Sequence, residues 1–219
     1  MKKNVGYLLG VLLSVFVISS CTDVYKEADA ESEEVVVPPG ETYTAQRKYT
    51  LNVVYYVPAD MMEFDPFTKI GKEWALLTAG SKEKANTMTI SWGGVGVLWG
   101  KNVAFVFVRD SRYTKELIDK NEFFSLSFLS EKYRDALNYC GSHSGRDEND
   151  KISAAGLTLT SRHSIPFIDE GNMILLCEKM SATRLTEDSF LMPEIAQKWY
   201  ADHDMHTMYI AEIIDILAR

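Results

Sequence analysis

Beyond Tyr49, short apolar runs alternate with polar segments rich in Gly, Asn, Asp and Lys. The runs contain many β-branched and aromatic residues, and their spacing is typical of antiparallel strands joined by turns rather than of βαβ units. Strands are expected at Leu51–Val57, Trp74–Thr78, Ala85–Trp92, Val103–Val108, Phe123–Leu129, Met173–Cys177 and Met208–Ile216. The pattern therefore predicts a mainly β protein, built as a Greek-key-like antiparallel barrel.

Helical spacing interrupts the strands at three places. One helix is predicted from Ser111, whose hydroxyl can cap it, through Asn121. Two more are predicted at Ser130–Tyr139 and Pro193–Ala201, where Pro193 suits a first helical turn. We expect these few helices to pack on the outside of the barrel.

The first twenty residues have the pattern of an export signal. Lys2 and Lys3 precede the apolar stretch Tyr7–Ile18, which is too short for a transmembrane helix of about 20 residues. Small residues then lead to Cys21, as in a bacterial lipoprotein signal; an ordinary secretory peptide or a membrane anchor is the alternative. We expect residues 1–20 to be removed and Cys21 to be lipidated. The exported protein would then be anchored to the cell envelope, on the periplasmic side or at the cell surface.

Charge and composition divide the rest of the chain into two parts. Residues 21–46 contain clustered acidic residues and Pro38-Pro39-Gly40, which predicts an acidic flexible tether. Residues 47–219 are enough for one domain with its own core. Without residues 1–20 the chain keeps 21 basic and 31 acidic residues, a net charge of −10. So acidic a chain lacks the basic patch that nucleic-acid binding requires, and no nucleic-acid partner is expected.

Cysteine is sparse. With Cys21 lipidated, only Cys140 and Cys177 remain. Two cysteines could pair in an oxidising compartment, but they make no disulfide framework, and we predict two unpaired thiols.

A dense polar cluster runs from Asn86 to Gly93 within one predicted strand. Side chains alternate between the two faces of a strand. One face takes Met88, Ile90 and Trp92, and the other takes Thr87, Thr89 and Ser91. The first face can enter the core while the second presents three hydroxyls. The alternative is an edge strand whose threonines face water.

A second cluster runs from Val108 to Thr114, where a strand ends and a helix begins. A helix N-terminus offers free amides and a partial positive charge to a phosphate. Arg109 and Arg112 add bidentate donors, and Ser111 and Thr114 add hydroxyls. A capped helix with two solvated arginines is the alternative, but the density of donors favours phosphate binding.

Two further segments carry candidate chemistry. In Tyr139–Asp147, glycines permit a tight loop whose hydroxyls, with Arg146 and Lys151 after it, suit an anion, although such a loop alone is usually a surface turn. Near the last strand, His203 and His206 stand three residues apart. Without a third fixed ligand this is a weak metal signal, and histidines in a surface turn are the simpler interpretation.

In this order, over most of residues 70–215, the clusters resemble the flavin reductase-like FMN-binding split-barrel family, especially its flavoredoxin-like branch. The resemblance implies a split β-barrel, a homodimer, and FMN, with the first cluster along the ring and ribityl chain. It also implies that the second cluster binds the phosphate and that the third cluster is a loop that closes over the flavin, often from the neighbouring subunit. The candidate FMN-binding residues are Asn86, Met88, Thr89, Ser91, Arg109, Ser111, Arg112, Tyr113, Thr114, Ser144 and Lys151.

The resemblance also implies a role for His206, which matches a histidine that approaches the flavin or its electron donor, and makes it the candidate for proton or hydride transfer. Two positions depart from the family. Asp110 stands where proline is usual, and Ala211 where glycine is usual before glutamate. The chain also has no Ser-Gly-Ala-Thr-like acceptor for covalent attachment, so noncovalent FMN is expected.

The leading hypothesis is an exported FMN-binding oxidoreductase or electron-transfer flavoprotein. Because reduced nicotinamide nucleotides are kept in the cytoplasm, its unidentified donor and acceptor are expected to be membrane or protein partners. The alternative is a non-enzymatic protein on the same barrel that binds flavin or another phosphate ligand, or an interaction protein with a degenerate, empty site.

Overall fold

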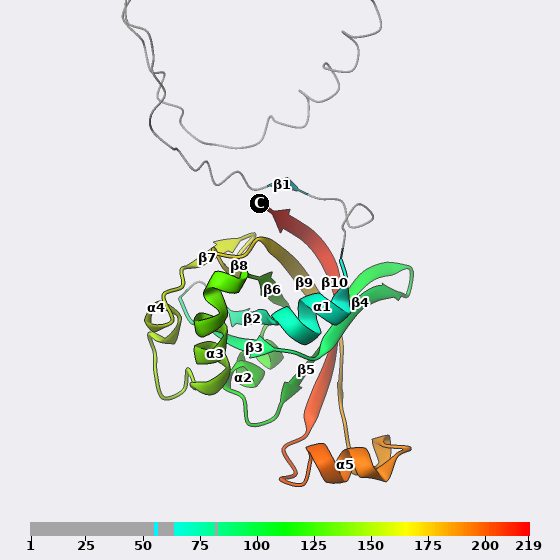
Figure 1. The fold of residues 1–219 in the computed structure, drawn as a ribbon. Helices are drawn as coiled ribbons and strands as arrows, with labels where there is room; N and C mark the ends of the chain where they lie inside the picture. The colour runs from blue at the N-terminus through cyan, green and yellow to red at the C-terminus, as the bar shows by residue number, and fades with distance from the viewer. Residues whose placement is uncertain (1–54, 57–63, 82) are drawn as a thin grey trace, which may run out of the picture. The chain divides into compact units, whose positions relative to one another are not determined.

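The computed structural model describes residues 55–56, 64–81 and 83–219 (Figure 1). The predicted export signal, the lipidated Cys21, the acidic tether and most of the first predicted strand lie outside these residues. None of the helices in the described segments is long and apolar enough to cross a membrane.

The architecture is mainly β, as predicted, and its principal sheet is antiparallel. Along that sheet the strands follow the order β3-β2-β6-β9-β10-β5-β4, and β1 pairs with β10. A separate hairpin is formed by β7 and β8. The strands are β1 (Tyr55–Tyr56), β2 (Ala75–Gly80), β3 (Ala85–Ile90), β4 (Gly93–Leu98), β5 (Lys101–Arg109), β6 (Phe123–Phe128), β7 (Leu159–Arg162), β8 (Ile165–Ile168), β9 (Met173–Arg184) and β10 (His206–Ala218).

Both faces of the central strand β6 are covered, which explains its sequence of alternating aromatic, aliphatic and serine residues. Phe124 and Leu126 enter the main core, and each such side chain stabilises the fold by about 1.5–3 kcal/mol on burial. On the opposite face the buried Ser125 hydroxyl donates to the carbonyl of Pro166 in β8, 2.7 Å away. The serine is therefore buried at little cost, because its hydroxyl is satisfied.

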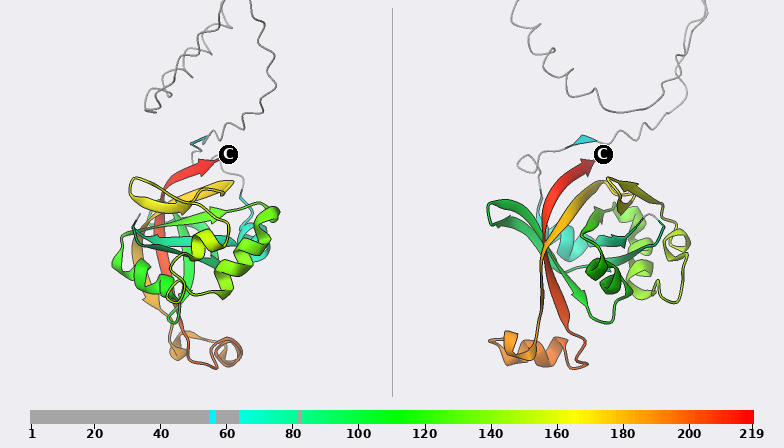
Figure 2. Two further views of the ribbon diagram at one scale, coloured as in Figure 1. Left: turned by 90° about the vertical axis from the view of Figure 1, so that its left-hand side faces the viewer. Right: turned by 180° about the vertical axis from the view of Figure 1, so that it is seen from behind.

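Helices α2, α3 and α4 cluster around the β2–β3 end of the sheet, and α5 lies apart at the end of the β9–β10 pair (Figures 1 and 2). The helical segments are α1 (Pro66–Thr68), the π-helical η2 (Lys69–Glu73), α2 (Tyr113–Lys120), the 3₁₀ turn η3 (Glu131–Tyr133), α3 (Arg134–Ser142), α4 (Lys151–Ala154), the 3₁₀ turn η4 (Glu187–Ser189) and α5 (Pro193–Trp199). We call residues 185–205, which leave β9 and return as β10, the arm.

The predicted helix cap at Ser111 is wrong. Helix α2 begins at Tyr113, and Arg112 occupies the cap position without a side-chain hydrogen bond to the helix. Ser111 is engaged elsewhere, because its amide and hydroxyl both donate to the carboxylate of Asp204 in the arm, at 2.9 and 2.6 Å. Asp204 lies far away in sequence, so no local pattern indicates this contact.

Strand β4 was missed because three of its six residues are glycines, which are poor strand formers. It pairs with β5 through a tight turn at Trp99 and Gly100, where both residues have positive φ, 53° and 72°. Strand β9 also runs beyond the predicted end at Cys177, to Arg184, because β10 pairs with it along its whole length.

The prediction of two unpaired thiols is confirmed. Cys140 and Cys177 are both free and buried. Burial raises the pKa of Cys140 to about 11, so this thiol stays protonated at neutral pH.

Candidate functional site

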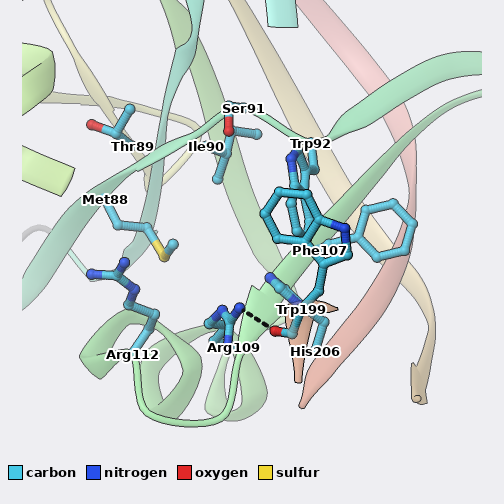
Figure 3. A pocket seen from close by; sticks show the side chains of 10 residues that line it. All are labelled: Met88, Thr89, Ile90, Ser91, Trp92, Phe107, Arg109, Arg112, Trp199 and His206. Carbon is cyan, nitrogen blue, oxygen red and sulfur yellow. Dashed lines mark hydrogen bonds between the residues drawn. The ribbon is translucent and has the colours of Figure 1, made fainter. Parts of the chain in front are cut away.

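A groove of two adjoining lobes lies between the end of β3, the turn from β5 to α2, and the arm. The first, which we call the aromatic lobe, has a volume of about 190 Å³ (Figure 3). Its lining residues are Met88, Thr89, Ile90, Ser91, Trp92, Phe107, Arg109, Arg112, Trp199 and His206. The second, the hydroxyl lobe, has a volume of about 110 Å³. Its lining residues are Asn86, Met88, Ser111, Arg112, Tyr113, Thr114, Cys140, Ser142, His143, Ser144, Gly145 and Lys151.

Met88 and Arg112 line both lobes, so the two lie side by side. Each lobe alone is smaller than the lower limit of about 300 Å³ for small-molecule pockets. An elongated ligand would therefore have to occupy both. All eleven predicted FMN-binding residues line one lobe or the other, and so does His206.

The groove is cationic although the whole chain has a net charge of −8. Arg109, Arg112 and Lys151 line it, and no Asp or Glu of the described segments does. Such a distribution favours an anionic ligand, because a charge in a partly desolvated site is stabilised by opposite charges nearby.

Strand β3 does not present three hydroxyls on one open face. Thr87 is fully buried and bonds to the hydroxyl of Thr78 at 3.0 Å, and the Thr89 hydroxyl donates to the carbonyl of Leu137 in α3. The predicted core position of Trp92 is wrong as well, since its side chain is 38% exposed at the rim of the aromatic lobe. The prediction for the hydroxyls failed because helices α2 and α3 pack against β3, so both of its faces are covered, and Trp92 lies beyond the end of β3 at Ile90.

The two arginines of the β5–α2 turn have different roles. Arg109 donates to the carbonyl of Asp204 and to that of Trp199, each at 2.9 Å, and so holds the arm against β5 (Figure 3). Its Nη1 also lies 3.6 Å from the Asp204 carboxylate. Arg112 donates through Nη1 to the carbonyl of Gly141 at 2.9 Å. In the described parts of the chain no carboxylate pairs with Arg112, so its charge is available to a ligand.

Hydrogen bonds to Asp204 hold one side of this turn in place. Burial raises the pKa of Asp204, but the two hydrogen bonds from Ser111 and the charge of Arg109 outweigh it and hold this pKa below its usual value. Asp204 is therefore ionised at neutral pH. The Ser111 hydroxyl therefore donates its proton within the protein, so it can accept a hydrogen bond from a ligand in the lobe but cannot donate one.

Two glycines of the third cluster allow close packing. A Cβ on Gly145 would lie 2.0 Å from Oδ1 of Asn86, and one on Gly141 would lie 3.3 Å from Cβ of Thr89. The buried Asn86 in turn donates to the hydroxyl of Thr114 at 2.8 Å. The loop thus lies directly on the polar floor of the hydroxyl lobe.

Arg146 does not line the groove, although the sequence suggested it for an anion. Its guanidinium forms an ion pair with Glu116 and lies over the ring of Tyr113. Arg146 thus connects the loop to α2. Of the residues predicted from this segment to bind an anion, Ser144 and Lys151 line the groove.

Lys151 is an unusual buried cation, with 3% of its surface exposed. Its Nζ donates to the carbonyls of Thr87 and Cys140, each at 2.8 Å, which leaves one of its three N–H groups for a ligand. Burial lowers the pKa of Lys151. The ammonium links β3 to α3 and so joins two walls of the hydroxyl lobe.

His206 is buried, not a surface histidine, with 7% of its surface exposed. Its Nδ1 lies 2.9 Å from the Tyr200 hydroxyl, and its ring centroid is 5.1 Å from that of Trp92. Burial, followed by the charge of Arg109, lowers the pKa of His206 to about 4, so the imidazole is neutral at pH 7. No group of three metal-ligating residues is present in the described segments, and His203 is exposed in a turn.

Several residues of the site were not predicted. Phe107 and Trp199 line the aromatic lobe, and the ring of Trp199 meets that of Trp92 edge-on at 5.1 Å. Trp199 and Tyr200 were visible only as the end of an amphipathic helix. The fold of the arm brings Trp199 to the groove and Tyr200 against His206, and no sequence signal indicates that.

The two departures from the family pattern lie outside the groove lining. Asp110 pairs with Nε of Arg184 at 2.8 Å, so its charge is partly neutralised and it does not cap α2. Ala211 is fully buried opposite Ala104 of β5, next to an irregularity in the pairing of β10 with β9.

The antiparallel split barrel is the fold of flavin reductase-like proteins. Residues 67–219 match the flavin reductase like domain family, and the chain belongs to that family. The comparison with curated proteins gave no match.

Solved structures share the fold. An FMN-binding domain of a flavin reductases-like enzyme from Shewanella baltica OS155 is 18% identical, with a TM-score of 0.54 over 76% of this chain and 78% of that one. The flavoredoxin of Methanosarcina acetivorans is 24% identical, with a TM-score of 0.52 over 67% and 68%. That of Desulfovibrio vulgaris (Miyazaki F) is 22% identical, with a TM-score of 0.52 over 67% and 69%. These likenesses confirm the predicted split-barrel fold.

Proposed function

We propose that the groove binds FMN noncovalently, with the phosphate in the hydroxyl lobe and the ring in the aromatic lobe. The observation that carries this proposal is the difference in lining between two adjoining lobes. One is lined by hydroxyls, Arg112 and Lys151. The other contains the aromatic side chains Trp92, Phe107 and Trp199 together with Met88 and Ile90, beside Arg109, Arg112, Thr89 and Ser91. A ligand with a planar ring at one end and a phosphate at the other matches both.

At the phosphate end, the available donors belong to four side chains. Arg112 has N–H groups beyond the one bound to Gly141, and Lys151 keeps one N–H. The Thr114 oxygen accepts from Asn86, which leaves its O–H free to donate, and the Ser144 oxygen accepts from the amide of Arg146 in the same way. Charge-assisted bonds from the two cations would supply most of the phosphate affinity.

At the ring end, apolar surface and free backbone groups are combined. Met88 and Ile90 come from β3, and Phe107 from β5. The pairing of β3 with β2 ends at Ile90, so the amides of Ser91 and Trp92 fall outside the ladder and suit the polar edge of a ring. When bound, flavin supplies electron transfer; the protein orients it, limits its contact with water and sets the charges around it.

We further propose that the protein is an oxidoreductase or electron-transfer flavoprotein that is exported and lipid-anchored through Cys21. Family membership supports the redox role, and the sequence of residues 1–21 supports the export. Outside the cytoplasm the electron donor and acceptor would be membrane or protein partners rather than nicotinamide nucleotides. Rapid turnover of NADPH by the FMN-loaded protein would contradict this part of the proposal.

We propose a homodimer as the working form. The arm presents large apolar side chains to solvent, among them Leu191 at 98% and Met192 at 55% exposure. Surface of this kind is typical of a protein–protein interface. Light scattering coupled to size exclusion would show twice the chain mass, and a monomer at micromolar concentration would contradict the assignment.

The alternative is a protein that binds flavin or another phosphate ligand without turnover. The engagement of Arg109 and Ser111 by the arm favours it, because both donors are already used within the chain. Photoreduction of the FMN-loaded protein separates the two functions. Fast reoxidation by a quinone or by a protein from the envelope fits electron transfer, whereas reoxidation only by air, at the rate of free flavin, fits a binding protein.

Reconstitution tests the binding proposal itself. Residues 47–219 are mixed with FMN, desalted, and their visible spectrum is recorded. Flavin absorbance that stays with the protein supports the site. A colourless protein that also fails to bind FMN by titration contradicts it.

A further inference from the structure

The arm contributes a hydrogen bond to His206, the histidine in the lining of the aromatic lobe. Tyr200 follows α5 directly, and 7% of its surface is exposed. Its hydroxyl lies 2.9 Å from Nδ1 of His206, and the two rings meet edge-on, 5.5 Å apart at 86°. The guanidinium of Arg109 lies over the Tyr200 ring, 5.5 Å from its centroid. Tyr200 is thus held in a fixed place beside the imidazole.

We propose that Tyr200 is a positioning residue: its hydroxyl donates to Nδ1 of His206 and thereby fixes the tautomer whose proton is on Nε2, as a donor toward the ligand ring. This inference rests on the proposed function only for the identity of that ring. The tautomer itself is a property of the ligand-free chain.

The direction of the hydrogen bond follows from the bonding capacity of the two groups. Burial raises the pKa of Tyr200, so its hydroxyl keeps its proton at neutral pH. Within the described segments that hydroxyl has no hydrogen-bond partner other than His206. If Nδ1 carried the proton and donated to Tyr200, the tyrosine proton would be buried without an acceptor, which costs about 1–3 kcal/mol. Donation from Tyr200 to Nδ1 avoids that cost.

The other ring nitrogen is free to meet a ligand. In the described part of the chain Nε2 has no hydrogen-bond partner, and it is not sealed in the interior, because His206 lines the aromatic lobe. With Nδ1 accepting and the ring neutral, the single proton must be on Nε2. A neutral N–H donor here stabilises negative charge on the ring of a bound ligand without supplying a full positive charge.

The arm therefore sets the chemistry of the groove as well as closing one side of it. Arg109 secures the arm through the carbonyls of Trp199 and Asp204, which flank Tyr200 on both sides. A change that loosens these contacts would release the Tyr200 hydroxyl and allow His206 both tautomers. The family match alone does not assign this role to the arm.

The test is imidazole NMR on the ¹⁵N-labelled full chain without FMN at pH 7. Long-range ¹H–¹⁵N spectra distinguish a protonated Nε2 from a protonated Nδ1, and His206→Gln identifies the signals. We expect His206 to carry its proton on Nε2, and Tyr200→Phe to shift the tautomer ratio by about tenfold, the equivalent of one hydrogen bond of about 1.4 kcal/mol. Tyr133→Phe, a change outside the groove lining, should leave the ratio unaltered.

A proton on Nδ1 in the unmodified chain would overturn the proposal, as would an unaltered tautomer in a folded Tyr200→Phe variant. If Tyr200→Phe does not fold, the tautomer of His206 in the unmodified chain still shows whether the proposal holds. A second readout is the midpoint potential of bound FMN, which should fall in Tyr200→Phe and stay constant in Tyr133→Phe. Failure to bind FMN with the expected tautomer in place would contradict the proposed function alone.

Discussion

Replacing Arg112 by glutamine separates phosphate recognition from ring recognition. Arg112 lines both lobes, and one of its N–H groups is bound to the Gly141 carbonyl. The remaining N–H groups are the ones assigned to the phosphate. Riboflavin has the same ring and ribityl chain as FMN but no phosphate, so comparing the two ligands isolates the contribution of that group.

The expected magnitude follows from the number of bonds lost. A hydrogen bond between charged partners contributes about 1.5–3 kcal/mol. Losing one such bond weakens FMN binding by about 10- to 150-fold in Kd. The bond to Gly141 is lost as well, which lowers the free energy of unfolding by about 0.5–1.5 kcal/mol. Riboflavin affinity should change by no more than about twofold, since a contact the ligand does not make contributes nothing to its binding.

Flavin fluorescence titrations measure both constants. Arg184→Gln is the matched control: it removes an arginine that pairs with Asp110, next to the same turn, but does not line the groove. It should leave the Kd of FMN within about twofold of the parent value, as expected for a surface ion pair of about 0–1 kcal/mol. Equal losses for FMN and riboflavin in Arg112→Gln, or no loss for either, would refute the assignment of the phosphate to Arg112.

Three further changes test other parts of the site. Gly145→Ala should weaken FMN binding, because the new methyl group would lie 2.0 Å from Oδ1 of Asn86 and must displace the loop; titration would show this, and an unchanged Kd would exclude close packing there. Lys151→Met should lower the free energy of unfolding in urea by about 1–3 kcal/mol, because two buried carbonyls lose their donor. His206 has a folded pKa of about 4 against 6.5 unfolded, so the unfolded chain binds its proton first as the pH falls. The free energy of unfolding is therefore unaffected by His206 above pH 6.5 and falls by up to about 3 kcal/mol as the pH decreases from 6.5 to 4. His206→Gln should remove this contribution, so the urea midpoint should fall less between pH 7 and pH 4.5 in the variant than in the unmodified chain. An equal fall in both chains would contradict the assignment.

The sequence indicated the groove because its chemistry is local. Arg112, Thr114 and Asn86 stand in short polar clusters at the ends of apolar runs, and the alternation of strands predicts where those runs end. The alternation also predicts correctly that Met88 is buried with Ile90 in the core. Each of these inferences depends on neighbours within a few residues.

The failures concern contacts between distant segments. Thr87 was expected to face solvent, yet it is fully buried, because α3 packs against the face of β3 that carries Thr87 and Thr89. Ser111 has the position of a helix cap, yet its partner is Asp204 in the arm. Tyr200 carries no signature of a site residue, because only the return of the arm as β10 places it against His206. Such pairings are set by the tertiary fold and leave no local pattern.

A crystal structure of residues 47–219 with FMN tests the central proposal most directly. We expect the phosphate in the hydroxyl lobe, within hydrogen-bond distance of Arg112 and Thr114, and the ring beside Met88 and His206 in the aromatic lobe. Flavin bound elsewhere, or bound with its phosphate beside Trp92, would contradict it.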